Sequence, residues 1–131
     1  LVRLEDDGSI SFGDYTLGEK KKLDGFEHAG DLYKVKTFAE ITKLEKNGAL
    51  LYESVPGTGV THLKESGEGL AFTVEGTEDA QLTVGCKENT SYQVIAGGKE
   101  LGVMSTGISG KLSLSVPLEA GQEVEVSIRE A

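Results

Sequence analysis

Residues 70–128 read LAFTVEGTEDAQLTVGCKENTSYQVIAGGKELGVMSTGISGKLSLSVPLEAGQEVEVSI, and apolar side chains recur there at every second position. This alternation runs through six short segments that are separated by turn residues and begin at Leu70, Ala80, Tyr92, Leu101, Leu112 and Val124. Successive side chains of a strand point to opposite faces, so each segment has one apolar and one polar face. The pattern is typical of antiparallel strands that cover a core on one side.

We therefore predict an all-β fold, with residues 1–131 forming a single antiparallel β-sandwich of the jelly-roll or immunoglobulin-like kind. Turn signals about every 8–12 residues predict about 10–12 strands. A chain of 131 residues can bury a core without metal or disulfide support. The predicted core consists of Leu70, Phe72, Val74, Leu82, Val84, Tyr92, Val94, Leu101, Val103, Leu112, Leu114, Val116, Val124, Val126 and Ile128.

The first half of the chain has a weaker strand pattern. Asn47-Gly48 is a strong hairpin signal, because both residues accept the positive φ of a type I′ turn. We expect it to join strands at 40–46 and 49–55, with a single helical turn at 38–40 as the alternative. The remaining strands are expected at 1–5, 10–12, 15–23, 32–38 and 60–64, and residues 24–31 as a loop or bulged strand.

Composition excludes several classes of protein. The formal net charge is −9, and the one basic run, Lys20-Lys21-Lys22, is interpreted as a solvated strand end or turn. A nucleic-acid partner is not expected, because nucleic-acid binders need a clustered basic surface. No segment approaches the roughly 18 apolar residues that would span a bilayer, so we expect no membrane span. With one cysteine, the chain cannot form an intramolecular disulfide.

We predict no catalytic residues, no metal site and no cofactor. A Gly-x-Ser-x-Gly nucleophile motif is lacking. Cys86 follows a strand whose alternation continues inward from Val84, which favours a buried structural thiol over a nucleophile. His28 and His62 fall short of the three or four ligands that zinc requires. Asp6, Asp7 and Asp14 lack the spacing of a calcium loop.

Aromatic residues concentrate before residue 65, so we place a candidate ligand site there. Its predicted residues are Tyr15, Tyr33, Tyr52, His28 and Asp31. A tyrosine ring can stack on a sugar while its hydroxyl stays hydrogen-bonded, and His28 and Asp31 would add oriented polar contacts. The alternative is that the tyrosines fill the core beside Val35 and Leu50.

Several segments resemble a family of small uncharacterised proteins from gut Firmicutes of the Lachnospiraceae type. These segments are GDYTL at 13–17, GDLYKVKTF at 30–38, YESVPGT at 52–58 and GKLSLSV at 110–116, and the resemblance covers nearly the whole chain. Some members carry an automatic endosialidase label, which implies a sialic-acid glycan as substrate. The second half also resembles β-sandwich modules of bacterial surface and carbohydrate-active proteins.

The chain does not carry the residues that the label implies. Arg3 and Arg129 are its only arginines, one near each end of the chain. The carboxylate of a sialic acid is normally bound by a cluster of arginines. We therefore expect a non-catalytic interaction protein or self-assembling scaffold, whose partner is a protein, a second copy of the chain included, or a glycan. A carbohydrate-binding module is the first alternative, and a glycan-processing enzyme is the second.

Overall fold

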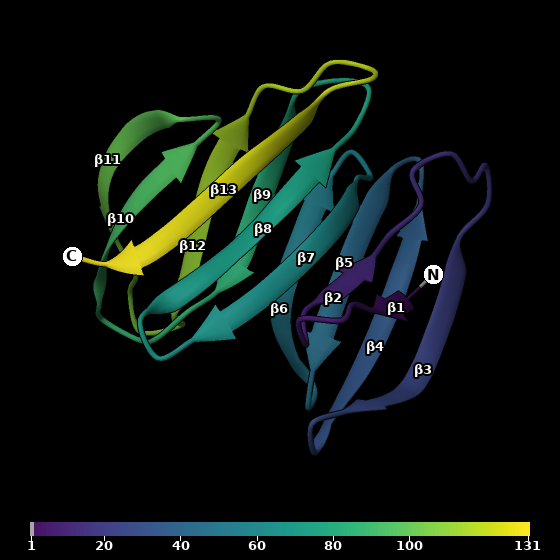
Figure 1. Ribbon diagram of the computed structural model, residues 1–131, viewed down its shortest axis with the longest axis horizontal. Coiled ribbons are helices and arrows are strands. Elements are labelled where there is room, and N and C mark those ends of the chain that lie inside the picture. The colour runs from purple at the N-terminus through teal and green to yellow at the C-terminus, as the bar shows by residue number, and fades with distance from the viewer. Residues whose placement is uncertain (1) are drawn as a thin grey trace.

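The computed structural model describes residues 2–131, and Figure 1 shows two antiparallel sheets packed against each other. This confirms the all-β sandwich. The described residues form thirteen strands, above the expected 10–12, and the two shortest, β1 and β2, have three residues each. The strands are β1 Val2–Leu4, β2 Ile10–Phe12, β3 Lys21–His28, β4 Asp31–Phe38, β5 Ile41–Lys46, β6 Ala49–Val55, β7 Gly59–Ser66, β8 Gly69–Glu75, β9 Ala80–Gly85, β10 Ser91–Ala96, β11 Lys99–Ser105, β12 Lys111–Val116 and β13 Glu123–Glu130.

The two sheets have different strand orders. Sheet A has seven strands in the order β1-β2-β7-β8-β13-β10-β11, and sheet B has six in the order β12-β9-β6-β5-β4-β3. Strand β13 therefore lies inside sheet A, where it pairs with β8 on one side and β10 on the other. Sheet B contains the continuous meander β3-β4-β5-β6, in which each strand pairs with the next one along the chain.

Two sequence signals predicted local structure correctly. The six alternating segments of residues 70–128 form β8 to β13 in order. Asn47 and Gly48 have φ angles of 51° and 81°, and Lys46 pairs with Ala49, as expected for the hairpin between β5 and β6. Both signals are local, and local alternation or turn chemistry is enough to determine them.

The strand expected at 15–23 is wrong in its position, because β3 begins only at Lys21. The preceding residues carry the chain from β2 in sheet A to β3 in sheet B. Asp14 accepts hydrogen bonds from the backbone N–H and the hydroxyl of Thr16, which holds a local turn instead of a strand. The segment 24–28, expected as a loop or bulged strand, is the second half of β3, with a register shift between Leu23 and Phe26.

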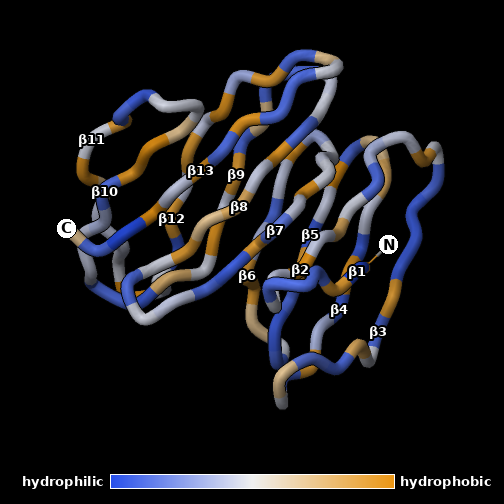
Figure 2. The backbone as a smooth tube through the Cα atoms, viewed as in Figure 1, coloured by the Kyte–Doolittle hydropathy of each residue, from blue (hydrophilic) through white to orange (hydrophobic). Residues whose placement is uncertain are grey.

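The core lies between the inner faces of the two sheets. At its centre the ring of Tyr52 packs edge-to-face against Phe12 and Phe72, with both pairs of centroids 5.4 Å apart. Such edge-to-face geometry is the preferred one for aromatic rings. Figure 2 shows the resulting alternation of hydrophobic and hydrophilic residues along β8 and β13, whereas β3 is mostly hydrophilic.

Twelve of the fifteen predicted core residues are buried, and Leu101 and Val124 are partly buried and pack against the core. The prediction for Val103 is wrong, because its side chain is 64% exposed. Val103 pairs with the exposed Gln93, while Met104 pairs with the buried Tyr92, so Met104 has the inward position. A register shift between Val94 and Ile95 and the positive φ of Gly102 break the alternation that the sequence suggested.

Candidate functional site

The five predicted ligand-binding residues occupy three separate places. Tyr52 is fully buried, and its hydroxyl lies 2.8 Å from the Thr58 hydroxyl, which in turn lies 2.7 Å from the Ser54 hydroxyl. Burial raises the pKa of Tyr52 well above its ordinary value, although the hydrogen bond with Thr58 opposes this. Tyr52 thus has the environment of a core residue, as in the alternative interpretation of the tyrosines.

Tyr33, His28 and Asp31 come together at the turn between β3 and β4. The rings of His28 and Tyr33 are 6.4 Å apart, but Tyr33 is only 5% exposed, and burial raises its pKa. Asp31 accepts a hydrogen bond of 2.9 Å from the amide of Asn47, which together with the charge of Lys46 lowers its pKa. Asp31 thereby supports the turn around Asn47.

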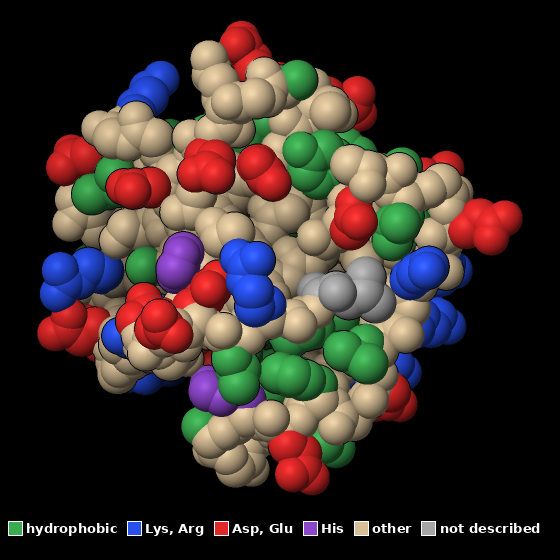
Figure 3. Space-filling view, turned by 45° about the vertical axis from the view of Figure 1, so that its right-hand side comes forward, with side chains coloured by type: hydrophobic (Ala, Val, Ile, Leu, Met, Phe, Trp, Pro, Cys, Tyr) green, Lys and Arg blue, Asp and Glu red, His purple; other side chains and the backbone are tan. Residues whose placement is uncertain are grey.

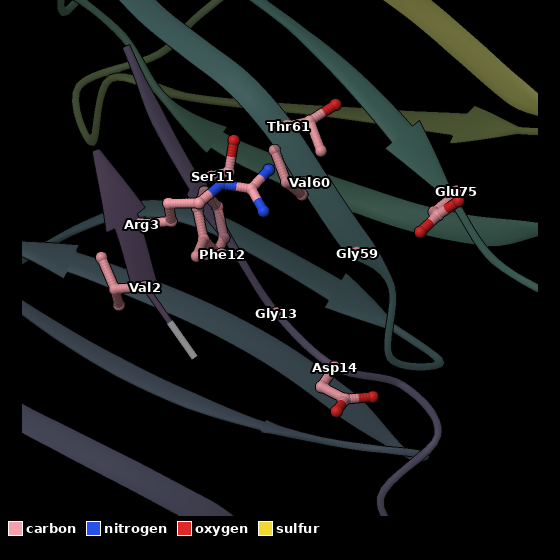
Figure 4. Close-up of a pocket in the computed structure, with 10 residues that line it drawn as sticks. All are labelled: Val2, Arg3, Ser11, Phe12, Gly13, Asp14, Gly59, Val60, Thr61 and Glu75. Atoms are coloured by element: carbon pink, nitrogen blue, oxygen red, sulfur yellow. The ribbon is translucent and has the colours of Figure 1, made fainter. Parts of the chain in front are cut away.

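Tyr15 lies at a different place, close to Gly59 and Glu75. A Cβ atom added at Gly59 would come 3.3 Å from the Glu75 carboxylate and 3.6 Å from the Tyr15 ring. A hollow of about 330 Å³ opens beside Glu75, and Figure 4 shows the Arg3 side chain on its opposite side. Arg3 is held by Glu5 through two hydrogen bonds, so its charge is already paired.

Ser9, His62 and Asp7 form the closest approach to a catalytic triad. The Ser9 hydroxyl lies 3.2 Å from Nδ1 of His62 and donates to the Asp7 carboxylate. A triad needs the serine and the carboxylate on different ring nitrogens. Here the Asp7 carboxylate lies 3.8 Å from the same Nδ1, so the group holds the β1–β2 turn and lacks the geometry of an activated nucleophile.

The main feature of the outer face of sheet B is a row of lysines that lie directly opposite one another. Lys22 of β3 pairs with Lys36 of β4, and Lys36 pairs with Lys43 of β5. Lys34 lies two residues before Lys36 and therefore on the same face. Lys20 precedes β3, and its ammonium group is 5.9 Å from the ring centre of Phe38, also on this face. We call these five lysines, 20, 22, 34, 36 and 43, the lysine face.

The lysine face encloses a shallow depression of about 150 Å³, which is lined by four of its lysines and by Glu45. The pKa of Lys36 is lowered, first by the charge of Lys20, then by burial and by Lys22 and Lys43. Carboxylates also belong to this surface: Lys43 forms an ion pair of 3.3 Å with Glu45, and in the strand register Lys43 lies opposite Glu53 and Lys34 opposite Glu45. In Figure 3, basic side chains gather along the right-hand rim of the molecule.

The sequence places Lys34 and Lys36 on one face of the expected strand 32–38, but it did not show that Lys20, Lys22 and Lys43 join them. Of Lys20-Lys21-Lys22, the outer two belong to the face, whereas Lys21 pairs with the inward-facing Thr37. The available signal was the alternation of Lys34 and Lys36 with Tyr33 and Val35. Alternation assigns the lysines of one strand to one face, but it does not show which strands pair.

Searches against protein-family models, curated proteins and solved structures each found no match to this chain. Residues 2–131 also contain no helix of the length and hydrophobicity that would cross a membrane. Any assignment of function therefore depends on the chemistry of the chain's own surfaces.

Proposed function

We propose that this protein is a non-catalytic β-sandwich module that binds an acidic glycan on the lysine face. The observation that carries the proposal is the row Lys22, Lys36 and Lys43 across three adjacent strands. Like charges directly opposite each other destabilise a sheet. An anion placed over the row would relieve this repulsion, so binding and stability would be coupled through the same three ammonium groups.

The size of the lysine face favours a ligand with spaced anionic groups. Strands are about 4.8 Å apart, so the row spans roughly 10 Å. Glu45 lines the depression and is ion-paired with Lys43, Glu53 lies opposite Lys43 on β6, and the whole chain carries a net charge of −9. A duplex nucleic acid has one charge about every 1.7 Å along its axis and would meet these carboxylates as well. A glycan with separated carboxylate or sulfate groups avoids this conflict.

A partly exposed aromatic ring also favours a glycan. Phe38 lies at the end of β4, on the same outer face as Lys34 and Lys36. Its ring could pack against the apolar face of a sugar, while the neighbouring ammonium groups of Lys20 and Lys36 bind the acid groups. The resemblance to proteins labelled endosialidase is compatible with such a ligand, because sialic acid carries a carboxylate.

Two features support a role without catalysis. The Ser9, His62 and Asp7 group has its hydroxyl and carboxylate on the same ring nitrogen, as described above. Cys86 is half-buried, and burial raises the pKa of its thiol to about 11, so little of it would be the nucleophilic thiolate at neutral pH.

The proposal is tested by isothermal titration with polysialic acid, heparin, neutral dextran and duplex DNA. The matched variants are Lys22→Gln/Lys36→Gln/Lys43→Gln and Lys21→Gln/Lys64→Gln/Lys99→Gln, which change the net charge equally. We expect an acidic glycan to bind the wild type and the second variant, to lose at least tenfold in affinity with the first, and to weaken with added salt. Equal affinity in both variants, tighter binding of duplex DNA, or no acidic glycan binding would overturn the proposal.

Self-association is a second candidate function, and one specific observation favours it. Sheet B ends on one side at β12, which has a continuous register with β9 and a single charged residue, Lys111. The geometry of this edge is independent of the lysine face.

A further inference from the structure

The described chain has four sheet edges, and three of them carry features that hinder pairing with another strand. Strand β1 has only three residues. Strand β3 has a register shift and two lysines, and β11 has Lys99, Glu100 and a register shift opposite β10. Short strands, charges and bulges are the usual ways in which proteins block sheet edges.

Strand β12 has fewer of these features, because it has one charged residue and no register shift. Its six residues pair with β9 in continuous register from Lys111↔Gly85 to Val116↔Ala80. The only charge within it is Lys111 at its beginning. The hydroxyls of Ser113 and Ser115 point toward β9. The Ser113 hydroxyl lies 3.4 Å from the Thr83 hydroxyl, and the Ser115 hydroxyl donates to the side-chain carbonyl of Gln81 over 2.6 Å. The outer edge of β12 is therefore regular, uncharged along most of its length and uncovered by its own side chains.

The hydrogen-bonding direction of this edge follows from a neighbouring contact. The N–H of Cys86 donates to the carbonyl of Gly110 over 2.7 Å. In an antiparallel pair, residues alternate between bonding the partner strand and pointing away from it. Gly110 and Leu112 therefore face β9, whereas the backbone groups of Ser113 and Ser115 face outward.

We propose that β12 pairs antiparallel with β12 of a second copy of this chain, with Leu114 opposite its counterpart. In this register Ser113 lies opposite the partner's Ser115, so their outward N–H and C=O groups bond each other. Leu112 lies opposite the partner's Val116, and all the paired apolar side chains are on the core side. A register centred on Ser113 would instead place Val116 opposite Gly110.

An exposed apolar side chain at this end of the sandwich also fits a second copy. Ile108, at 83%, is the most exposed large hydrophobic residue of the described chain. It lies in the loop that leads into β12. Figure 1 shows β12 behind β13, toward the end of the molecule where β10 and β11 lie.

The pairing would join two copies of sheet B into one sheet of twelve strands. Opposite residues share a face in such a sheet, so both lysine faces would point to the same side. In each copy β4 is the fifth strand of sheet B, counted from β12 at the shared edge. The two β4 strands are therefore nine strand spacings of about 4.8 Å apart, which separates the two Lys36 residues by roughly 43 Å. If the proposed glycan function holds, the dimer would be a bivalent binder of a polymer.

Sedimentation of the protein without ligand tests the pairing. We expect a mass that rises with concentration toward twice the 13.9 kDa of one chain. Added salt should strengthen the association, because each copy carries a charge of −9. Ser113→Pro removes an outward N–H and should give a monomer, whereas Ser113→Thr keeps the N–H and should still dimerise. Circular dichroism establishes that both variants are folded.

Disulfide trapping tests the register and does not depend on the proline variant. In a Cys86→Ala background, an oxidised mixture of Ser113→Cys and Ser115→Cys chains should form a crosslinked dimer, and neither chain alone should do so. The opposite Cα atoms would be about 5.5 Å apart, within the range of a disulfide. A monomer at all concentrations, a dimer that salt dissociates, or equal crosslinking of each chain with itself would overturn the inference.

Discussion

Lys36 of β4 lies directly opposite Lys43 of β5, so two ammonium-bearing side chains leave the same face of sheet B from neighbouring strands. The charge of Lys22 continues this arrangement on the other side of Lys36. A residue with a lysine on both sides should be the most sensitive position of the surface.

Lys36→Gln should weaken acidic-glycan binding by about tenfold, because it removes one charge-assisted contact. Lys21→Gln is the matched control: it removes the same charge from the neighbouring edge strand, but Lys21 pairs with the inward-facing Thr37. Titration calorimetry compares the two variants. An equal loss of affinity would mean that overall charge, and not the lysine face, governs binding.

The melting temperature of Lys36→Gln should equal or exceed that of the wild type in the absence of ligand, because the substitution relieves repulsion with Lys22 and Lys43. Ligand should raise the melting temperature of the wild type more than that of the variant. A scanning calorimeter measures both effects, and a clear destabilisation of the free variant would contradict the repulsive role of the row.

The contribution of Lys36 to stability should rise with pH below about 10.5. The pKa of Lys36 in the folded protein is lowered from 10.5, first by the charge of Lys20. Between the lowered pKa and 10.5, this side chain binds more protons in the unfolded chain than in the folded chain, so its contribution to the free energy of unfolding increases with pH. Glycan affinity should fall over the same interval, because binding needs the ammonium charge.

Titration of the Lys36 side chain by NMR measures this pKa directly. Lys20→Gln removes the largest cause of the shift and should return the pKa toward its ordinary value. Identical titration of Lys36 in both proteins would show that Lys20 does not act on it.

Tyr52→Phe should cost about 1 kcal/mol of stability, since it removes a buried hydrogen bond while Thr58 keeps its contact with Ser54. Glycan binding should not change, because Tyr52 is enclosed in the core. Urea unfolding and calorimetry test the two parts, with Tyr15→Phe as the control outside the network. A loss of glycan binding at unchanged stability would contradict this prediction and indicate that Tyr52 contacts the ligand.

Leu114→Ala should cost about 2–5 kcal/mol, because Leu114 is only 3% exposed. Val103→Ala should change stability by less than about 0.5 kcal/mol, because Val103 points to solvent. Urea unfolding of the two variants under the same conditions makes the comparison. A large loss for Val103→Ala would indicate that a partner chain covers this residue.

The sequence contained enough information for the strands but not for their partners. Alternation located β8 to β13, and Asn47-Gly48 located a hairpin, because both depend on neighbouring residues alone. The lysine face depends on the pairing of β3, β4 and β5, and Lys22 and Lys36 are 14 positions apart in the chain. The exposure of Val103 depends on a register shift on the adjacent strand β10.

Strand β13 joins two parts of sheet A that have no other connection within the sheet, β8 on one side and the hairpin β10–β11 on the other. On a ribosome, residues 123–130 emerge after all their partners. Until β13 has emerged, β8 and β10 each lack the strand that pairs with one of their edges. Sheet A is therefore incomplete, and the apolar inner faces of β8 and β10 cannot pack as they do in the folded protein. We expect the nascent chain to acquire protease resistance late and in a single step, after β13 has left the exit tunnel.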